Sequence, residues 1–304
     1  MARELSILLL AAGLGTRLRP LTLQMPKPLV PVVDETILAR QAKLARTVFG
    51  ARLHINAFYL ADKLKTSAES IGFSRVWVES PEILGTGGPL HRMYAEGFRG
   101  ELLVMNSDCH CRFDLNNFIS NARNSGASFA LLGVDYPKVN SIGVDAEGRL
   151  SRVNKRFDFG TSVIPATFSG ISWYSEYALS EIFGEERDVV RFWERKAKAG
   201  EAPWVDLSQK DSPWIDMGSP DGLMRACFAR LAELRTDRWI CPGSPLASDS
   251  AFLARSSDFV IQEGARVPAT ATLKNALLFA GAQVNENEFV TNEIRGLNFN
   301  WKLQ

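Results

Sequence analysis

The first strand-like run of this chain ends in a glycine-spaced loop, and this junction constrains the fold more than any other feature. Residues 5–10 (LSILLL) are mostly large and apolar, without period-2 alternation. Such a run is typical of a strand buried on both faces, as in a parallel sheet. The loop after such a strand lies at the carboxyl edge of the sheet, where open α/β folds bind their ligands.

The loop itself has the composition of an anion site. Gly13 and Gly15 let a ligand approach the main chain, and outward N–H groups at such a loop form a concavity for anions. Arg17 and Arg19 add guanidinium forks that match phosphate oxygens, and Lys27 follows between two prolines. We interpret the segment as a polyphosphate cradle. The alternative is a plain strand-to-helix turn with solvated arginines.

A longer ordered string surrounds these glycines. Residues 9–22 have the form LxAAGxGTRLxPLT, and PKPLVPV follows at 26–32. Together they resemble the signature of the sugar-1-phosphate nucleotidyltransferases, and the resemblance extends over most of residues 5–235. In that family the loop holds a nucleoside triphosphate, and its arginine and lysine contact the phosphates. The resemblance therefore implies a catalytic role for Arg17 and Lys27 and nucleotide binding by Ala11, Ala12, Gly13, Gly15, Thr16 and Arg17.

A carboxylate follows a second buried strand. Residues 102–105 are apolar, and Asp108 comes directly after Asn106 and Ser107. A carboxylate at the end of a buried strand usually has a cation or hydrogen-bond donors beside it, although a helix cap or turn is the alternative. The strand resembles the family's Asn-Gly-Asp strand, with serine in place of glycine. In that family the aspartate binds Mg²⁺, which implies a catalytic, metal-binding Asp108.

A second carboxylate lies in the string WIDMGSP at 214–220. The string resembles the family's Trp-x-Asp-x-Gly-[Thr/Ser]-Pro, which implies that Asp216 is the second metal ligand and a catalytic residue. Mg²⁺ takes one or two carboxylates and fills its other positions with water and phosphate oxygens. Because Asp108 and Asp216 are far apart in sequence, their pairing rests on the resemblance. Ser219 followed by Pro220 also has the pattern of a helix N-cap, which is compatible with this role.

Three further segments resemble the sugar-binding side of the family. The loop at 85–89 (GTGGP) resembles one that approaches base and sugar, which implies that Gly87 and Gly88 bind the nucleotide. Gly170 resembles the glycine that lets the sugar lie against the backbone. Lys155 stands where relatives often have Glu-Lys-Pro, which implies a sugar-phosphate contact. The missing glutamate puts a sugar-hydroxyl contact in doubt, and a solvated loop is the alternative for Lys155.

The order of the elements predicts the fold class. Strand-like runs alternate with helix-like ones, which predicts a mostly parallel sheet. Residues 140–173 have the pattern of short antiparallel strands, and residues 175–199 and 219–236 have that of helices. The resemblance implies an α/β, Rossmann-like, three-layer nucleotidyltransferase (GT-A-like) domain with a mixed sheet. We expect this catalytic domain over residues 1–238 and a linker over residues 239–256.

The last segment, residues 257–304, has a different period. It resembles the hexapeptide repeat of left-handed β-helices; the alternative is a loose tail of short strands. About two coils are too few to stand alone, so the segment is expected to pack on the catalytic domain or on another subunit of a homo-oligomer. The apolar residues that recur every six positions, with one slip before the last two, are Ile261, Val267, Leu273, Phe279, Val284 and Val290.

Composition excludes several classes of protein. The formal net charge is +1, which gives no field favouring nucleic acid or an anionic membrane. No apolar run approaches the roughly 20 residues that span a bilayer. Four cysteines make no disulfide framework, and the thiols and imidazole of residues 109–111 (CHC) do not converge on a regular strand, so we expect no zinc site. These features predict a cytoplasmic protein.

The motifs together predict an enzyme that joins a nucleoside triphosphate and a sugar 1-phosphate with Mg²⁺ as cofactor. They resemble most closely the group of mannose-1-phosphate guanylyltransferases and N-acetylmuramate-1-phosphate uridylyltransferases. Two alternatives stay open: the same fold acting on phosphocholine and CTP, and a catalytically silent homologue that binds nucleotide-sugars. The sequence leaves the base and the sugar open.

Overall fold

The computed structural model describes residues 4–154, 156–161 and 164–303. Two compact units are formed, each from two stretches of chain. The first unit contains Met1–Gly13 and Leu38–Trp214, and the second contains Leu14–Ile37 and Ile215–Gln304. The second unit thus combines a segment that follows the first strand with the C-terminal part of the chain.

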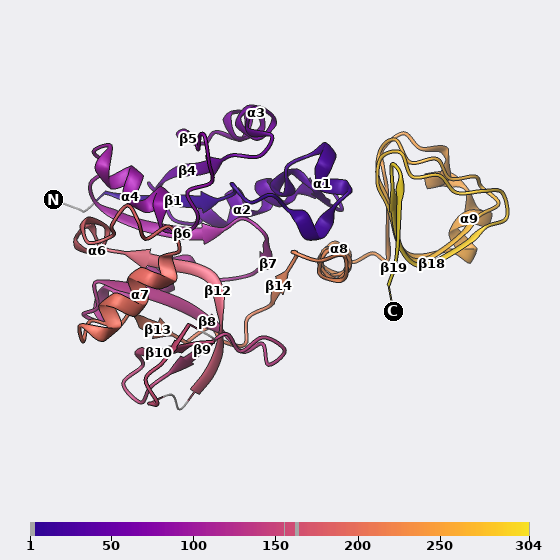
Figure 1. Ribbon diagram of the computed structural model, residues 1–304. Coiled ribbons are helices and arrows are strands. Elements are labelled where there is room, and N and C mark those ends of the chain that lie inside the picture. Colours follow the sequence, from indigo (N-terminus) through magenta and orange to yellow (C-terminus); the bar gives the residue numbers. More distant parts are fainter. Residues whose placement is uncertain (1–3, 155, 162–163, 304) are drawn as a thin grey trace. The chain divides into compact units, whose positions relative to one another are not determined.

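The first unit is built on a ten-stranded mixed sheet. β1 (Leu5–Leu10) lies between β4 (Arg52–Ala57) and β6 (Glu101–Asn106) and is parallel to both (Figure 1). β5 (Arg75–Val78) extends this parallel part, whereas β12 (Ile164–Tyr174) is antiparallel to β6. The other strands of the sheet are β8 (Phe129–Val134), β9 (Ile142–Val144), β10 (Leu150–Val153), β11 (Phe157–Asp158) and β13 (Trp204–Asp206).

Apolar helix residues cover one face of this sheet. Leu8 of β1 and Val104 of β6 share a buried cluster with Leu90 of α4 and Phe192 of α7. Burial of such side chains contributes about 1.5–3 kcal/mol each, which fixes the strands of the site in place. The helices of the first unit are α2 (Ile37–Ala45, whose first residue belongs to the second unit), α3 (Ala61–Ile71), α4 (Gly88–Ala95), α5 (Leu115–Asn124), α6 (Glu176–Ser180) and α7 (Val189–Lys198); β7 (Cys109–Cys111) is a further short strand.

The second unit joins the glycine-loop segment to the C-terminal strands through one core. Leu18 and Val30 from the loop segment share this core with Leu223 from α8 (Pro220–Glu233) and with Leu277 from β17. Its shorter elements are η1 (Thr16–Leu18), α1 (Leu21–Gln24), η2 (Lys27–Leu29), β2 (Pro31–Val32), β3 (Glu35–Thr36), η3 (Pro245–Ser248) and α9 (Ser250–Arg255). The sequence boundary between the two units falls within β14 (Trp214–Asp216).

The C-terminal strands form stacked turns of parallel sheet (Figure 1). Ser257 pairs with Lys274 and Lys274 with Thr291, so each turn takes 17 residues. That length is one residue short of three hexapeptides, which accounts for the slip in the sequence period. The strands are β15 (Arg238–Ile240), β16 (Ser257–Ile261), β17 (Thr272–Leu278) and β18 (Phe289–Gly296), closed by the antiparallel β19 (Phe299–Lys302).

Most predicted elements are confirmed, with one exception among the helices. The parallel strands and the antiparallel strands after residue 140 are present. The helix expected over 175–199 is wrong in part: α6 and α7 are separated by residues 181–188, which leave the helix to contact the loop at 84–88. Ser219 does cap α8, because its hydroxyl accepts a hydrogen bond from the Gly222 N–H at 3.1 Å.

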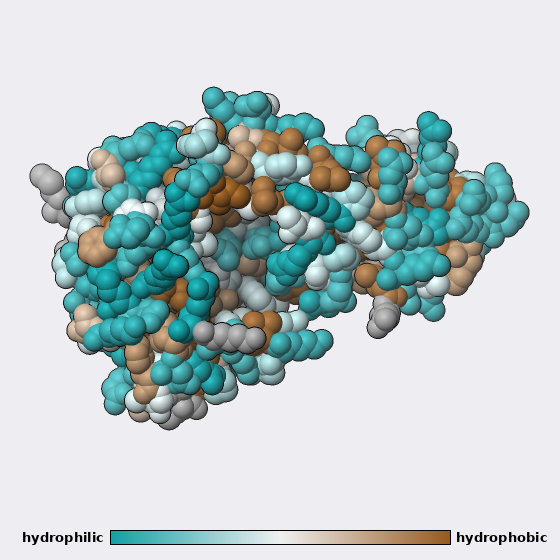
Figure 2. Space-filling view, in the orientation of Figure 1, coloured by the Kyte–Doolittle hydropathy of each residue, from teal (hydrophilic) through white to brown (hydrophobic). Residues whose placement is uncertain are grey.

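On the face shown in Figure 2, hydrophilic side chains cover most of the surface and hydrophobic ones form small separate patches. Among the helices of the described residues, none has the length and apolar character needed to cross a membrane.

Candidate functional site

The predicted site residues of the first unit gather at the carboxyl edge of the parallel strands. Leu10, the last residue of β1, pairs with Asn106, the last residue of β6. The Ser107 hydroxyl donates a hydrogen bond of 2.7 Å to the Leu10 carbonyl, which ties the two strand ends together. Ala11 and Asp108 follow directly at this edge. The serine that replaces the family's glycine therefore has a structural use that the sequence did not reveal.

Gly13 in the first loop has open space where a side chain would lie. It is exposed, and a Cβ built on it would meet no described atom within 4 Å. Packing within the protein therefore does not require a glycine here. A residue without a side chain at this position leaves the backbone open to a ligand, as predicted for a phosphate-binding loop.

The second glycine loop, residues 84–88, is pressed against the segment that interrupts the helices. The Gly87 N–H donates to the Arg187 carbonyl at 2.8 Å, and the Val189 N–H donates to the Thr86 hydroxyl at 3.0 Å. A Cβ on Gly87 would lie 2.0 Å from the carbonyl oxygen of Glu186, and one on Gly85 would lie 2.3 Å from that of Arg187. These glycines are therefore required by close backbone packing as well as by any role in binding.

Gly170 lies beside the end of β6, as a residue of the predicted sugar site should. Its φ of +87° belongs to the left-handed region, and the pairing of β12 with β8 shifts register around it. A Cβ there would lie 2.8–2.9 Å from the Asn106 side chain. The neighbouring Ser169 carbonyl accepts a hydrogen bond of 2.9 Å from the Trp214 indole. This packing brings Gly170 to the same sheet edge as Asp108.

The second unit places two predicted catalytic residues side by side. The Arg17 Nη1 lies 3.6 Å from the Asp216 Oδ2, and their side chains are 64% and 42% exposed. The Gly218 N–H donates a hydrogen bond of 2.7 Å to the Asp216 Oδ1, which fixes the carboxylate. A Cβ on Gly218 would lie 2.1 Å from the Arg17 Nη2, so the guanidinium occupies the space above this glycine.

Gly15 shapes the segment between these residues. Its φ is +62°, and its carbonyl accepts a hydrogen bond of 2.8 Å from the Thr22 hydroxyl. A Cβ on it would lie 3.2 Å from the Lys27 Cβ, so the predicted phosphate lysine starts close to the glycine loop. The exposed Thr16 follows as the first residue of η1. Gly15, Thr16, Arg17 and Lys27 thus share one short stretch of the second unit.

The two predicted metal ligands belong to different units. Asp108 lies in the first unit and Asp216 in the second, and their joint role stays a prediction. Both offer carboxylate oxygens, the donor type that Mg²⁺ prefers, and Asp216 is held by a backbone N–H rather than buried in an apolar setting. The donor chemistry therefore fits the ion. Lys155, the predicted sugar-phosphate contact, lies outside the described residues.

The Cys-His-Cys run on β7 is engaged by α2. The Arg40 Nη2 lies 3.1 Å from the His110 Nδ1, and the Gln41 side chain donates to the Cys109 carbonyl. Burial raises the pKa of the Cys111 thiol to about 12, which disfavours the thiolate that a metal would need. Within the described part of the chain, no group of three His, Cys, Asp or Glu side chains is placed to hold a metal ion.

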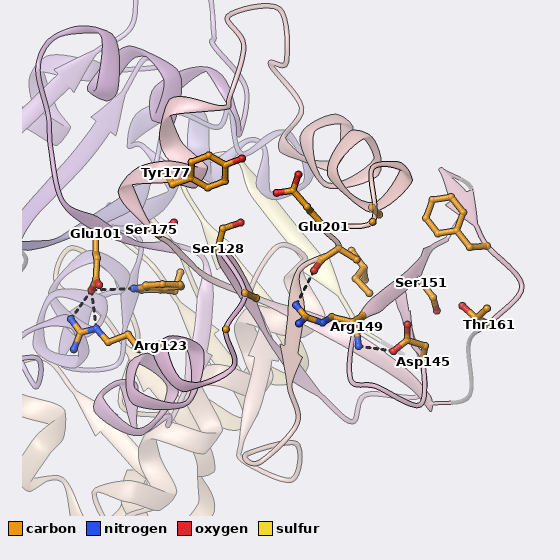
Figure 3. A pocket seen from close by; sticks show the side chains of 18 residues that line it. Glu101, Arg123, Ser128, Asp145, Arg149, Ser151, Thr161, Ser175, Tyr177 and Glu201 are labelled. Carbon is orange, nitrogen blue, oxygen red and sulfur yellow. Dashed lines mark hydrogen bonds and ion pairs between the residues drawn. The ribbon is translucent and has the colours of Figure 1, made fainter.

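A cavity of about 870 Å³ lies at the opposite edge of the sheet (Figure 3). Glu101, at the start of β6, lines it, about 16 Å of strand away from Asn106. Its charged groups are engaged within the protein: Glu101 accepts from Arg123 at 2.6 Å, and Arg149 donates to the Ala202 carbonyl at 3.3 Å.

Comparisons with known proteins identify the family of this chain. The family model described as Nucleotidyl transferase matches residues 6–232. The mannose-1-phosphate guanylyltransferase catalytic subunit beta of Drosophila pseudoobscura pseudoobscura is 31% identical over 143 residues, which cover 45% of this chain and 38% of that protein. The probable mannose-1-phosphate guanylyltransferase 3 of Oryza sativa subsp. japonica is 27% identical over 314 residues, covering 95% and 85%. The chain thus spans less than half of the first relative.

Solved structures share the fold. HddC from Yersinia pseudotuberculosis superposes with a TM-score of 0.59 at 22% identity, covering 74% of this chain and 99% of that one. An apo UDP-glucose pyrophosphorylase superposes with a TM-score of 0.61 at 17% identity, covering 76% and 100%. These likenesses confirm the predicted α/β nucleotidyltransferase fold.

Proposed function

This chain belongs to the nucleotidyl transferase family, and from that premise we propose that it joins a nucleoside triphosphate to a sugar 1-phosphate and releases pyrophosphate. The observation that carries the proposal is the exposed pair of Arg17 and Asp216 beside Gly218. Both side chains stay partly open to solvent, and a backbone N–H holds the carboxylate, so the pair remains available to a ligand. Their residue types match those that the motifs predict for phosphate and metal binding.

The reaction follows from these groups. An oxygen of the sugar 1-phosphate attacks the α-phosphorus, a new P–O bond forms, and the bond to the β-phosphate oxygen breaks, so pyrophosphate leaves. Arg17 and Lys27 hold the β- and γ-phosphates and offset the charge that grows on the leaving group. Lys155 binds the sugar phosphate, while Gly87, Gly88 and Gly170 leave room for base and sugar. Catalysis is then positioning and charge stabilisation, with no covalent enzyme intermediate.

Mg²⁺ is the cofactor we propose for this site, with Asp108 and Asp216 as its protein ligands. The ion, when bound, would neutralise phosphate oxygens and orient them for displacement. The role of this chain is to supply two carboxylates, one after β6 and one before Gly218. The support for this assignment is the oxygen-donor chemistry of the two side chains and their place in the motifs.

GTP and mannose 1-phosphate are the first substrate pair to test, because the relatives named above are mannose-1-phosphate guanylyltransferases. A pyrophosphate-release assay with Mg²⁺ would pair each common nucleoside triphosphate with a set of sugar 1-phosphates and with phosphocholine. One strong sugar 1-phosphate pair supports the proposal and names both substrates. Turnover with CTP and phosphocholine alone supports the first alternative. No pyrophosphate release with any pair, together with retained nucleotide-sugar binding, supports the second alternative, a catalytically silent homologue.

The carboxylates give the matching variant test. Asp108→Asn and Asp216→Asn should each lower kcat at least a hundredfold with little change in melting temperature, because the shape is kept and only the charge is lost. Asp221→Asn is the control, since this exposed carboxylate on α8 pairs with Arg225 at the surface and belongs to none of the predicted site motifs. Near wild-type turnover of Asp108→Asn would remove that residue from the metal role.

The C-terminal part completes the proposal for the whole chain. We propose that the catalytic domain ends near residue 238, that residues 239–256 connect it, and that residues 257–304 form a left-handed β-helix which mediates a homo-oligomer. The 17-residue turn supports a three-sided coil. We also propose a cytoplasmic location, which the free cysteines Cys109, Cys111, Cys227 and Cys241 support. Light scattering after gel filtration tests the oligomer, and a monomeric mass would refute it.

A further inference from the structure

Two buried polar side chains join the backbones of the two glycine loops in the first unit. The Ala11 N–H, just before Gly13, donates a hydrogen bond of 2.6 Å to the Asn56 Oδ1. The Asn56 Nδ2 donates one of 2.7 Å to the Glu79 Oε1. The Glu79 Oε2 accepts one of 2.7 Å from the Leu84 N–H, just before Gly85. An unbroken chain of three hydrogen bonds therefore connects the loop after β1 with the loop after β5.

The burial of this chain makes it costly to break. Asn56 is 1% exposed and Glu79 is 3% exposed. Burial raises the pKa of Glu79, whereas the hydrogen bonds from the Leu84 N–H and the Asn56 amide act in the opposite direction. Loss of Asn56 leaves the buried Ala11 N–H without this partner, and loss of Glu79 leaves the part-buried Leu84 N–H without it. A polar group that loses its hydrogen bond away from water destabilises the folded loop. Core packing alone does not explain a buried carboxylate at this position, because an apolar side chain fills a core without the desolvation penalty of a charged group.

The loop at 84–88 is held from its other side as well. The Gly87 N–H and the Thr86 hydroxyl bond to the chain around Arg187 and Val189, as described above. Glu79 supplies the hydrogen-bond contact that connects this loop to the β1 loop. A second side-chain hydrogen bond joins β4, the strand that carries Asn56, to β5, the strand that ends just before Glu79. In this bond the Trp77 indole lies 3.4 Å from the His54 Nδ1, and it reaches neither loop.

We propose that Asn56 and Glu79 are positioning residues, which set the distance between the triphosphate loop at 11–13 and the base-and-sugar loop at 84–88. This inference rests on the proposed function, since it assigns these loops to one nucleotide. Neither side chain is proposed to touch the substrate. They act through the Ala11 and Leu84 amides, so their loss loosens both loops and weakens triphosphate binding.

The first measurement is amide hydrogen exchange of the ligand-free protein, followed by mass spectrometry. Glu79→Ala and Asn56→Ala should speed exchange of Ala11 and Leu84 about tenfold or more. Glu79→Gln keeps one carbonyl acceptor, so it should protect one loop and not both. Trp77→Phe is the matched control, because it removes a side-chain hydrogen bond between β4 and β5 that reaches neither loop, and it should leave both loops at wild-type exchange rates.

The second measurement is the KM for the triphosphate found by the pyrophosphate assay, and the Kd for the same triphosphate by calorimetry. Both should rise about tenfold in Glu79→Ala and Asn56→Ala and stay near wild type in Trp77→Phe, with a smaller change in kcat. Because the two residues act through one chain of hydrogen bonds, the double variant should be less affected than the product of the single effects.

The outcomes separate this inference from the proposed function. Unchanged exchange at both loops in Glu79→Ala, or faster exchange with unchanged triphosphate Kd, overturns the positioning role even if the enzyme is active. A wild-type protein that binds triphosphates but releases no pyrophosphate with any pair refutes the proposed function, and the Kd comparison still decides the inference. A wild-type protein that binds none of ATP, GTP, CTP, UTP or dTTP overturns both.

Discussion

At the scale of single residues, a substitution at Gly218 should affect catalysis much more than the stability of the fold. An alanine Cβ there would lie 2.1 Å from the Arg17 Nη2 and 2.8 Å from the Asp216 Oδ1. Both atoms are at the ends of exposed side chains, so they can move at low cost. We therefore expect Gly218→Ala to lower kcat/KM tenfold or more while the melting temperature changes by only a few degrees. Steady-state kinetics and thermal unfolding check this, and unchanged kcat/KM would show that the position of Arg17 is not critical.

His54 makes the stability of the first unit depend on pH. Burial, followed by the charges of Arg75 and Arg52, lowers its pKa from 6.5 to about 4, and its Nδ1 accepts from the Trp77 indole. Between these values the unfolded chain binds more protons than the folded one, so stability falls as pH falls through this window and is complete above pH 6.5. From pH 7.5 to pH 5 the loss is about 2 kcal/mol.

Urea unfolding of the wild type and of His54→Gln at these two pH values measures the effect. The substitution lowers stability at both pH values by removing a buried side chain, so the informative quantity is the difference in pH dependence. The wild type should lose about 2 kcal/mol more than the variant on acidification. Equal losses in the two proteins would show that His54 titrates normally.

At the scale of elements, the two glycine loops respond differently to the same substitution. Gly87→Ala would place a Cβ 2.0 Å from a backbone carbonyl, which cannot move aside easily, so we expect a loss of about 1–3 kcal/mol in stability. Gly13→Ala meets no described atom, so stability should stay near wild type while triphosphate affinity falls. Denaturant unfolding and calorimetry of both variants test this, and a stable Gly87→Ala would contradict the close packing of its loop.

The same loops show which parts of the site could be predicted from sequence. Strands such as Leu5–Leu10 and caps such as Ser219, which accepts from the Gly222 N–H, follow from local pattern and were predicted. The link between Asn56 and Glu79 was not, because it joins side chains on two strands that only the folded sheet brings together. The interruption of the helix at 181–188 was missed for a similar reason. Backbone carbonyls of this segment pack on Gly85 and Gly87, and the apolar spacing of a helix does not indicate such a contact.

At the scale of the whole molecule, the C-terminal turns support the glycine-loop segment directly. Val260, Leu277 and Ile294 pair in register on successive turns and face the core that holds Leu18 and Val30. The Gln262 side chain also donates a hydrogen bond of 2.8 Å to the Val33 carbonyl. The period of six in the sequence indicated a coil, yet it did not show which apolar residues face outward to this core. The C-terminal segment is therefore part of the framework of Arg17 and Lys27.

Two leucines on one strand test this framework. Leu277 and Leu273 are both buried in β17, but Leu277 belongs to the core shared with the loop segment, whereas Leu273 belongs to the interior core of the turns. Each Leu→Ala variant should lose about 2–5 kcal/mol, because each leaves a cavity. Under native conditions, Leu277→Ala should speed hydrogen exchange of residues 16–30 and raise the triphosphate Kd. Leu273→Ala should leave both near wild type, so equal effects of the two variants would show that the segment responds only to global stability.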